Sequence, residues 1–364
     1  MSIDFLHLTF IALAAFAVTA TLLLALRPLA ALVGLVDRPG GRKLHHGDVP
    51  LVGGVAMFVG VALVVAGGEH LGHNELMLLL TSAFMVFLGA LDDRFDLQPR
   101  LRLLAHVSAA IVLVYGTRFS VPDLGNLLGF GVIPLGLLAL PFTVVATVAL
   151  INAFNMLDGL DGLAGGTALV TFIGIAAIAV MHTAPTSLLM STSMIGALLA
   201  FLIFNMPAQF NRAVRVFMGD AGSTFIGFVL AGVGLTLVQP SRADIEPVVV
   251  LWLMPIPIFE LFASTARRML DGMPVSTADT GHFHHRFIRA GFSVRAVFVG
   301  YLLFSLFGVS VAVVGAKGGL PESLLGGGFC VLFGVWVLIV KLAPRLARWL
   351  PESWQRHDIV AKAD

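Results

Sequence analysis

Aspartates that could hold a metal ion bound to phosphate groups lie in three separate segments of this chain. They occur in the sequences LDDRFDL (Asp92 and Asp93), NAFNMLDGLDGLAGG (Asp158 and Asp161) and VFMGDAGS (Asp220). Mg²⁺ prefers oxygen ligands and is usually held by one or two carboxylates together with substrate phosphates. Together the three segments indicate a site for a metal–diphosphate complex, although any one aspartate taken alone could be a helix cap or a solvated loop residue.

The second segment has a regular spacing of polar residues. Asn155, Asp158 and Asp161 recur every three residues, and a helix with about 3.6 residues per turn would place them along one side. A row of like charges repels itself unless a cation or hydrogen-bond donors lie against it. We expect the row to face the metal–phosphate complex; a structural hydrogen-bond network around a re-entrant turn is the alternative.

A cluster of donors follows in GHFHHRFIRAGFS, which contains His282, His284, His285 and Arg286. Zinc is one reading, but zinc sites usually need three or four nitrogen or sulfur ligands in a tetrahedron. On a regular backbone the adjacent His284 and His285 should point apart. Hydrogen bonding to phosphate oxygens is therefore favoured, and a cluster that merely lies at the membrane interface is the third reading.

An earlier segment, DRPGGRKLHHGDVPLVGG, combines basic side chains with glycines. Arg42, Lys43 and His45 could bind phosphate. Gly53 and Gly54 start an expected helix, where backbone N–H groups favour an anion. The alternative partner for this segment is the anionic headgroup of a membrane lipid.

The elements that must position these residues are membrane helices. Hydrophobic residues make up 58% of the 364 residues and charged residues 12%, against roughly 25% charged in a soluble chain. The mean hydropathy is +0.97. The net charge of +1 gives no reason to expect nucleic acid as a partner. Cys330, the single cysteine, lies in an apolar run and is read as a packing residue.

The apolar runs predict an all-α polytopic integral membrane protein with about eleven transmembrane helices, because a bilayer needs ~20 apolar residues per span. The first run is too long for a signal peptide and is read as a retained span. No internal repeat or second domain is evident, so residues 1–364 are read as one domain. The expected spans are 5–34, 50–67, 76–91, 103–116, 132–151, 167–181, 187–206, 222–239, 247–264, 296–315 and 324–343.

Basic residues assign the two sides of the membrane, since short cytoplasmic loops retain Lys and Arg. One set of alternate loops with the C-terminal tail holds 18 of the 22 lysines and arginines, the other set holds 3, and Arg27 lies in the first span. This predicts an N-terminus outside and a cytoplasmic C-terminus. The candidate site residues then fall in cytoplasmic loops at about 37–50, 92–102, 152–166, 207–221 and 265–295.

Five motifs in this order resemble the polyprenyl-phosphate N-acetylhexosamine-1-phosphate transferase family. They are RKLHHGDVPLVGG, LDDRFDL, NAFNMLDGLDGLAGG, VFMGDAGST and GHFHH, and the resemblance covers about residues 37–293. It implies transfer of N-acetylhexosamine 1-phosphate, first of all GlcNAc 1-phosphate, from a UDP-sugar to undecaprenyl phosphate with release of UMP. It further implies Mg²⁺, which Mn²⁺ could replace, and a site on the cytoplasmic face of a bacterial inner membrane. A homodimer stays open.

The resemblance also implies roles for the residues. Asp220 matches a metal ligand, Asp92 and Asp93 match a pair at the lipid phosphate, and the Asn155 segment with Asp158 and Asp161 matches the nucleotide side. The histidines match a diphosphate-binding motif that Asp279 precedes, and Phe217 is expected to stack on uracil. A phosphate monoester has a second pKa of ~6. A base is therefore hardly needed, and direct attack is expected, with Asp92 as base, metal ligand or covalent nucleophile left open.

The sugar and the reaction both have alternatives. Thr280 and Gly281 replace the basic residue and glutamine that usually precede the histidines in this family, so GalNAc, QuiNAc or FucNAc could be the sugar. Phospho-MurNAc-pentapeptide transfer is the second reading. A transporter is the alternative of another class, although the spans are nearly free of charge and the exception, Glu260, lies near the end of the ninth.

Overall fold

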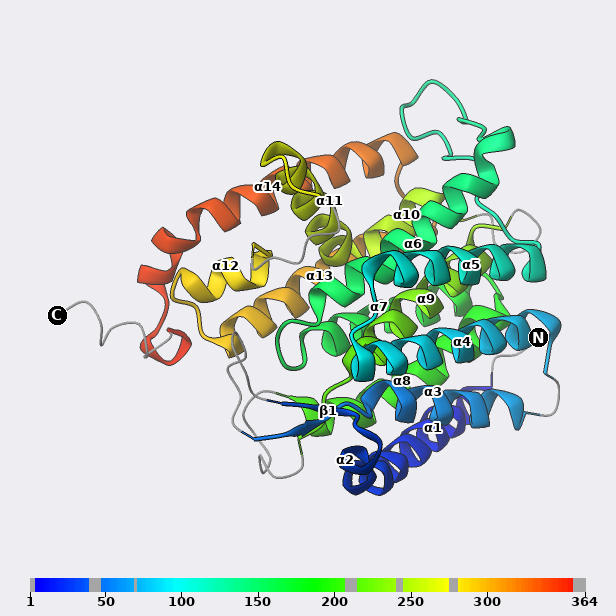
Figure 1. Cartoon of the computed structure of the whole chain (residues 1–364). Helices are drawn as coiled ribbons and strands as arrows, with labels where there is room; N and C mark the ends of the chain where they lie inside the picture. The colour runs from blue at the N-terminus through cyan, green and yellow to red at the C-terminus, as the bar shows by residue number, and fades with distance from the viewer. Residues whose placement is uncertain are drawn as a thin grey trace.

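The computed structural model describes residues 4–38, 47–68, 71–206, 215–239, 245–274 and 281–355. Helices account for most of these residues, and the longer ones run side by side (Figure 1). The first seven helices are α1 (Phe5–Leu26), α2 (Ala30–Val33), α3 (Gly53–Ala66), α4 (His73–Phe95), α5 (Pro99–Thr117), α6 (Ala139–Leu157) and α7 (Leu163–Met181). The remaining seven are α8 (Pro185–Asn205), α9 (Gly219–Leu237), α10 (Pro247–Leu253), α11 (Pro255–Leu270), α12 (Phe283–Arg289), α13 (Val294–Ala316) and α14 (Glu322–Leu346).

The helical, multi-span architecture predicted from the sequence is confirmed. Among the described residues, 9 helices are long and apolar enough to cross a membrane, or 10 if the bent pair α10 and α11 forms one span. The 14-residue α3 is a shorter apolar helix. Each of the eleven expected segments thus contains a helix or the bent pair, while eleven crossings and their orientation stay predictions.

The ninth expected segment is not one straight helix. α10 and α11 meet at an angle of 90° around Met254, whose φ and ψ of −141° and 52° are not helical. Pro255 and Pro257 follow directly. Proline lacks the N–H that would continue the preceding helix and disfavours helical backbone in the residue before it, which explains the break.

Two short strands, β1 (Val36–Asp37) and β2 (Val49–Pro50), pair antiparallel. They lie at the same end of the bundle as α12 (Figure 1). A sequence reading that searched only for apolar runs could not detect such two-residue strands. They bring the start of α3 toward residues 215–218, because the N–H of Phe217 donates to the carbonyl of Pro50 at 2.9 Å.

Helix α9 is the central element of the fold. In the most apolar stretch of α9, 89% of the residues are buried inside the protein, against 22% in that of the span Phe5–Val33. Three neighbouring helices approach α9 through a glycine: a Cβ at Gly54 would lie 2.6 Å from the carbonyl carbon of Ala221, one at Gly89 2.5 Å from its nitrogen, and one at Gly227 2.7 Å from the Cα of Ile151. These approaches hold α3, α4 and α6 against α9, where small residues let membrane helices pack closely.

Candidate active site

Asp92 and Asp220 face each other through Arg102. One carboxylate oxygen of Asp92 accepts a hydrogen bond from the Arg102 guanidinium at 2.8 Å, and the other accepts the N–H of Leu97 at 2.9 Å. The same guanidinium nitrogen lies 3.8 Å from Asp220 Oδ2. Only 6% of Asp92 is exposed. A buried carboxylate needs such partners to stay in place, so Arg102 links the ends of α4 and α9.

Asp93 caps helix α9 from helix α4. Its Oδ1 accepts the N–H of Asp220 at 2.7 Å, and its Oδ2 accepts the N–H of Ala221 at 3.1 Å. Gly219 begins α9 with a φ of 69°, and a Cβ there would lie 2.8 Å from Asp93 Cγ. The first N–H groups of a helix lack partners within the helix and favour a negative charge. Asp93 therefore fixes where Asp220 lies.

Asn155 reaches the same carboxylate from α6. Its side-chain N–H₂ donates to Asp220 Oδ1 and, at 3.0 Å, to Ser223 Oγ. The carboxylate of Asp220 is thus oriented by Asn155 on one side and faces Arg102 on the other. The three aspartate segments predicted to meet do meet, at the start of α9.

The Asp158 carboxyl lies close enough to Asp220 and Asp161 for their charges to shift its pKa. Burial, followed by the charges of Asp220 and Asp161, raises the pKa of Asp158 to about 8. Each of these causes disfavours the ionised form. A divalent cation placed among these carboxylates would lower that pKa again, because a bound cation is the largest local charge in such a site.

The expected helical row of Asn155, Asp158 and Asp161 is wrong in its backbone. α6 ends at Leu157, and residues 158–162 form turns that finish with Gly162 at a φ of 75°. Asp161 is directed to Arg215, with which it forms an ion pair. The cause lies in DGLDG, where glycines allow turn conformations that end a helix.

Asn205 and Arg215 hold this turn against the segment before α9. Asn205 accepts the N–H of Gly162 at 2.7 Å and donates to the carbonyl of Val216 at 2.8 Å. The guanidinium carbon of Arg215 lies 4.8 Å from the ring centre of Phe217. Arg215 thus covers one face of Phe217, and the stacking of Phe217 on uracil stays a prediction.

The histidine segment touches the Asp158 turn. A Cβ at Gly159 would lie 3.0 Å from His284 Cε1, so the imidazole rests on the backbone beside Asp158. His284 is 1% exposed, and neither of its ring nitrogens has a hydrogen-bond partner within the described part of the chain. Burial, then the charges of His285 and His282, lowers the pKa of His284 well below its usual value. A neutral, buried and unpaired imidazole beside the aspartates is suited to bind a ligand.

The expectation that His284 and His285 point apart is wrong. Their ring centres are 4.2 Å apart, although His284 and His285 are adjacent residues in the first turn of the short helix α12. The rings of His282 and His284 stack with centres 5.7 Å apart and an interplanar angle of 2°. The described residues contain no group of three or more His, Cys, Asp or Glu that could hold a metal ion.

Arg286 lies on the exposed side of α12. It lines a cavity of about 580 Å³ with Arg289, Lys341 and residues of α14. Its predicted contact with phosphate stays a prediction.

Other predicted residues fall outside the described part of the chain. These are Arg42, Lys43, His45 and Asp279. The predicted phosphate site at the start of α3 is wrong, because the N–H groups of Gly53 and Gly54 donate to the carbonyls of Phe217 and Met218 at 3.0 and 3.1 Å.

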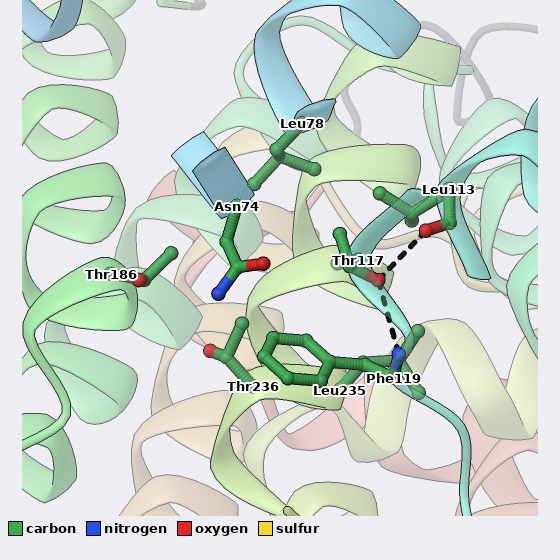
Figure 2. Close-up of a pocket in the computed structure, with 9 residues that line it drawn as sticks. Asn74, Leu78, Leu113, Thr117, Phe119, Thr186, Leu235 and Thr236 are labelled. Carbon is green, nitrogen blue, oxygen red and sulfur yellow. Dashed lines mark hydrogen bonds between the residues drawn. The ribbon is translucent and has the colours of Figure 1, made fainter. Parts of the chain in front are cut away.

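A small pocket lies at the opposite ends of α4 and α9. It is lined by Asn74, Thr117, Thr186, Thr236 and their apolar neighbours (Figure 2). Its volume of about 10 Å³ is room for about one water molecule. It is far too small for a nucleotide sugar.

Comparison with known proteins places the chain in a family. Residues 75–238 match glycosyl transferase family 4. Undecaprenyl-phosphate alpha-N-acetylglucosaminyl 1-phosphate transferase of Escherichia coli (strain K12) is 34% identical over 342 residues, which cover 94% of this chain and 93% of that protein. The chain belongs to glycosyl transferase family 4. Family members with the same name are 35% identical in Yersinia pestis, with 92% of each chain covered, and 34% identical in Haemophilus influenzae, with 94% of this chain and 96% of the relative covered.

Sequence reasoning missed several residues of this family member's candidate site. Arg102 and Arg215 were counted only as basic loop residues, although each pairs with a site aspartate. Glu260 was noted only as a charge in an apolar span. An ionisable residue in such a span is by default a candidate functional residue, and that signal could have identified it.

The donor set around Asp220 suits magnesium. The carboxylate of Asp220 lies within electrostatic reach of both Asp92 and Asp158. Mg²⁺ usually takes one or two carboxylates and completes its shell with phosphates and water, so it does not need a group of three protein ligands. Asp220, flanked by Asp92, is the residue that would hold it.

Proposed function

We propose that this protein transfers N-acetylhexosamine 1-phosphate, first of all GlcNAc 1-phosphate, from its UDP-sugar to undecaprenyl phosphate and releases UMP. The carrying observation is the meeting of Asp92, Asp93 and Asn155 at Asp220, at the start of α9. The names of relatives that cover more than nine-tenths of the chain support the substrate assignment. The product would begin a cell-surface polysaccharide such as O-antigen.

The reaction needs little proton transfer. A lipid monophosphate has a second pKa of ~6 and is mostly dianionic at neutral pH. One of its oxygens attacks the β-phosphorus of the UDP-sugar, and the bond from that phosphorus to the bridging oxygen breaks. UMP leaves with the bridging oxygen. Such transfers depend on alignment and on neutralising charge at the phosphates.

The described residues can supply both requirements. Asp220, flanked by Asp92, would hold Mg²⁺ or Mn²⁺, which supplies positive charge for the phosphates when bound. A single guanidinium, that of Arg102, lies against the carboxylates of both Asp92 and Asp220 and fixes their relative position. His284 would donate a hydrogen bond to a phosphate oxygen, since its unpaired nitrogens lie beside the Asp158 turn.

The proposed location is a bacterial inner membrane, with the site on the cytoplasmic face. The apolar helices and the bacterial relatives support a multi-pass membrane protein. The uneven distribution of Lys and Arg supports the orientation. A nucleotide sugar from the cytosol and a lipid phosphate at the interface would then meet at one end of the bundle. The single-domain reading and a homodimer remain proposals.

The test is a panel of UDP-sugars with purified protein, undecaprenyl phosphate and Mg²⁺, scored by UMP formation. UDP-GlcNAc is expected to give UMP, and Asp220→Asn to abolish it. Asp271→Asn is the matched control, because Asp271 is exposed at the end of α11. UMP formed from UDP-MurNAc-pentapeptide alone would favour phospho-MurNAc-pentapeptide transfer as the reaction. Uptake into liposomes without UMP from any sugar would replace the enzyme with a transporter.

A further inference from the structure

Glu260 is a buried acid in an otherwise apolar stretch. It lies in α11 within the sequence PIPIFELF and is 1% exposed. Burying an ionised carboxylate is strongly unfavourable unless hydrogen bonds or a charge partner compensate. The contacts that compensate for its burial therefore indicate the role of Glu260.

The described hydrogen bonds of the Glu260 carboxylate all lead to the histidine segment. Its Oε1 lies 2.8 Å from His282 Nδ1 and accepts the N–H of Phe283 at 3.0 Å, while Oε2 lies 3.2 Å from the same N–H. One turn further along α11, Ser264 Oγ lies 3.2 Å from His282 Nδ1. The carboxylate thus binds the first residue of α12 and the residue that caps it.

The bend in the chain makes this contact feasible. α11 leaves α10 at 90°, and Figure 1 shows α11 directed away from the common axis of the long helices. Glu260 and Ser264 are four residues apart, so they lie on the same face of α11. Both are buried on that face. A straight helix would not turn this face toward residues 282–283.

His282 is connected to the Asp158 turn through His284. The His282 ring stacks on the His284 ring, and the His284 ring rests on Gly159. A carboxylate that accepts from Nδ1 requires a proton on that nitrogen, which leaves Nε2 of a neutral His282 as an acceptor. Second-layer carboxylates fix histidine orientation and tautomer in the same way at metal sites.

We infer that Glu260 is the positioning residue of the histidine cluster. It holds the start of α12 and the tautomer of His282, so that His284 lies where it can contact a phosphate group beside Asp158. This inference rests on the proposed transfer reaction for its effect on turnover. The contact between Glu260 and α12 is testable without any activity.

The experiment combines kinetics with amide hydrogen exchange on purified full-length protein. Glu260→Gln keeps the shape of the side chain but removes its charge, and we expect kcat for UMP release to fall roughly 10- to 100-fold. KM for both substrates should change less, since no substrate contact is removed. Exchange in a peptide covering residues 281–289 should become faster, while exchange over residues 92–102 stays unchanged.

Two further variants keep the test decisive. Ser264→Ala removes the weaker contact to His282 and should lower kcat less than Glu260→Gln, which covers the case in which the latter does not fold. Glu322→Gln is the matched control: Glu322 Oε2 accepts the N–H of Asn126 at 2.6 Å, in a part of the chain outside the candidate site. Its kcat should equal that of the wild type.

Each outcome decides the inference. Unchanged exchange over residues 281–289 in Glu260→Gln overturns it, whatever the activity. Faster exchange with unchanged kcat also overturns it, because the histidines would then not need positioning. If wild-type protein forms no UMP from any sugar, the proposed function fails, and the exchange result alone decides whether Glu260 holds α12.

Discussion

Asp93 and Asp92 are adjacent in the sequence, yet the structure gives them different tasks. Asp92 faces Arg102 and Asp220, whereas both oxygens of Asp93 accept N–H groups at the start of α9. Replacing Asp93 by Asn leaves one acceptor oxygen and turns an N–H₂ group toward a backbone N–H. The variant should therefore weaken the junction between α4 and α9 and displace Asp220.

The size of the effect follows from the two hydrogen bonds. A hydrogen bond to a charged group contributes ~1.5–3 kcal/mol, and a negative charge at a helix N-terminus adds ~0.3–1 kcal/mol. Loss of one bond and of the charge should cost ~2–4 kcal/mol. At roughly 2 °C per kcal/mol for a large domain, thermal unfolding in detergent should shift down by several degrees.

The assay is a melting curve measured alongside UMP release. Asp96→Asn is the matched control: Asp96 is exposed, ends α4 with a φ of 49°, and Asn tolerates that backbone well. Its melting temperature should equal or slightly exceed that of the wild type. An Asp93→Asn protein that melts like the wild type but lacks activity would refute the capping role and make Asp93 a group that acts on substrate.

Three further predictions concern packing, pH and metal. Gly89→Ala should cost ~1–3 kcal/mol and reduce UMP release, because the new Cβ would lie 2.5 Å from Ala221 N; Gly334→Ala, with open space around its Cα, should change neither. The pKa of Asp158 is raised to about 8, so the folded, cation-free protein binds more protons than the unfolded chain. The contribution of this proton to the free energy of unfolding is complete below about pH 4 and is lost as the pH rises through about 8. Melting temperature in EDTA should fall from pH 6 to 9 more steeply for the wild type than for Asp158→Asn, and equal slopes would count against the buried acid. EDTA should abolish UMP release and added Mg²⁺ or Mn²⁺ restore it, whereas full activity in EDTA would remove the metal from the account.

The helices and the three acidic segments could be predicted because they are local features of the sequence. A long apolar run identifies a span wherever its neighbours lie, and each aspartate motif sits at the end of such a run. The meeting of Asp92, Asn155 and Asp220 could be expected from the side of the membrane alone. Their hydrogen-bond partners could not, because a pair such as Asp93 and Ala221 is 128 residues apart in the chain.

Some local expectations failed, and one residue was overlooked, for identifiable physical reasons. Spacing by three residues suggested a helix through Asp161, but glycines at 159 and 162 allow turns there. The N–H groups of Gly53 and Gly54 were assigned to phosphate because the carbonyls that accept them, those of Phe217 and Met218, belong to a segment distant in sequence. Glu260 received no role, although Pro255 and Pro257 signal a break before it, because its partner His282 lies 22 residues further along the chain.

The most direct measurement follows the two phosphates of the donor. Purified protein, undecaprenyl phosphate and Mg²⁺ would be incubated with UDP-GlcNAc that carries a radiolabel in its β-phosphate. The account predicts that the label moves into the lipid fraction and that unlabelled UMP appears in equal amount, with both lost in Asp220→Asn. Label retained in released UDP would show transfer of the sugar without its phosphate and would contradict the account.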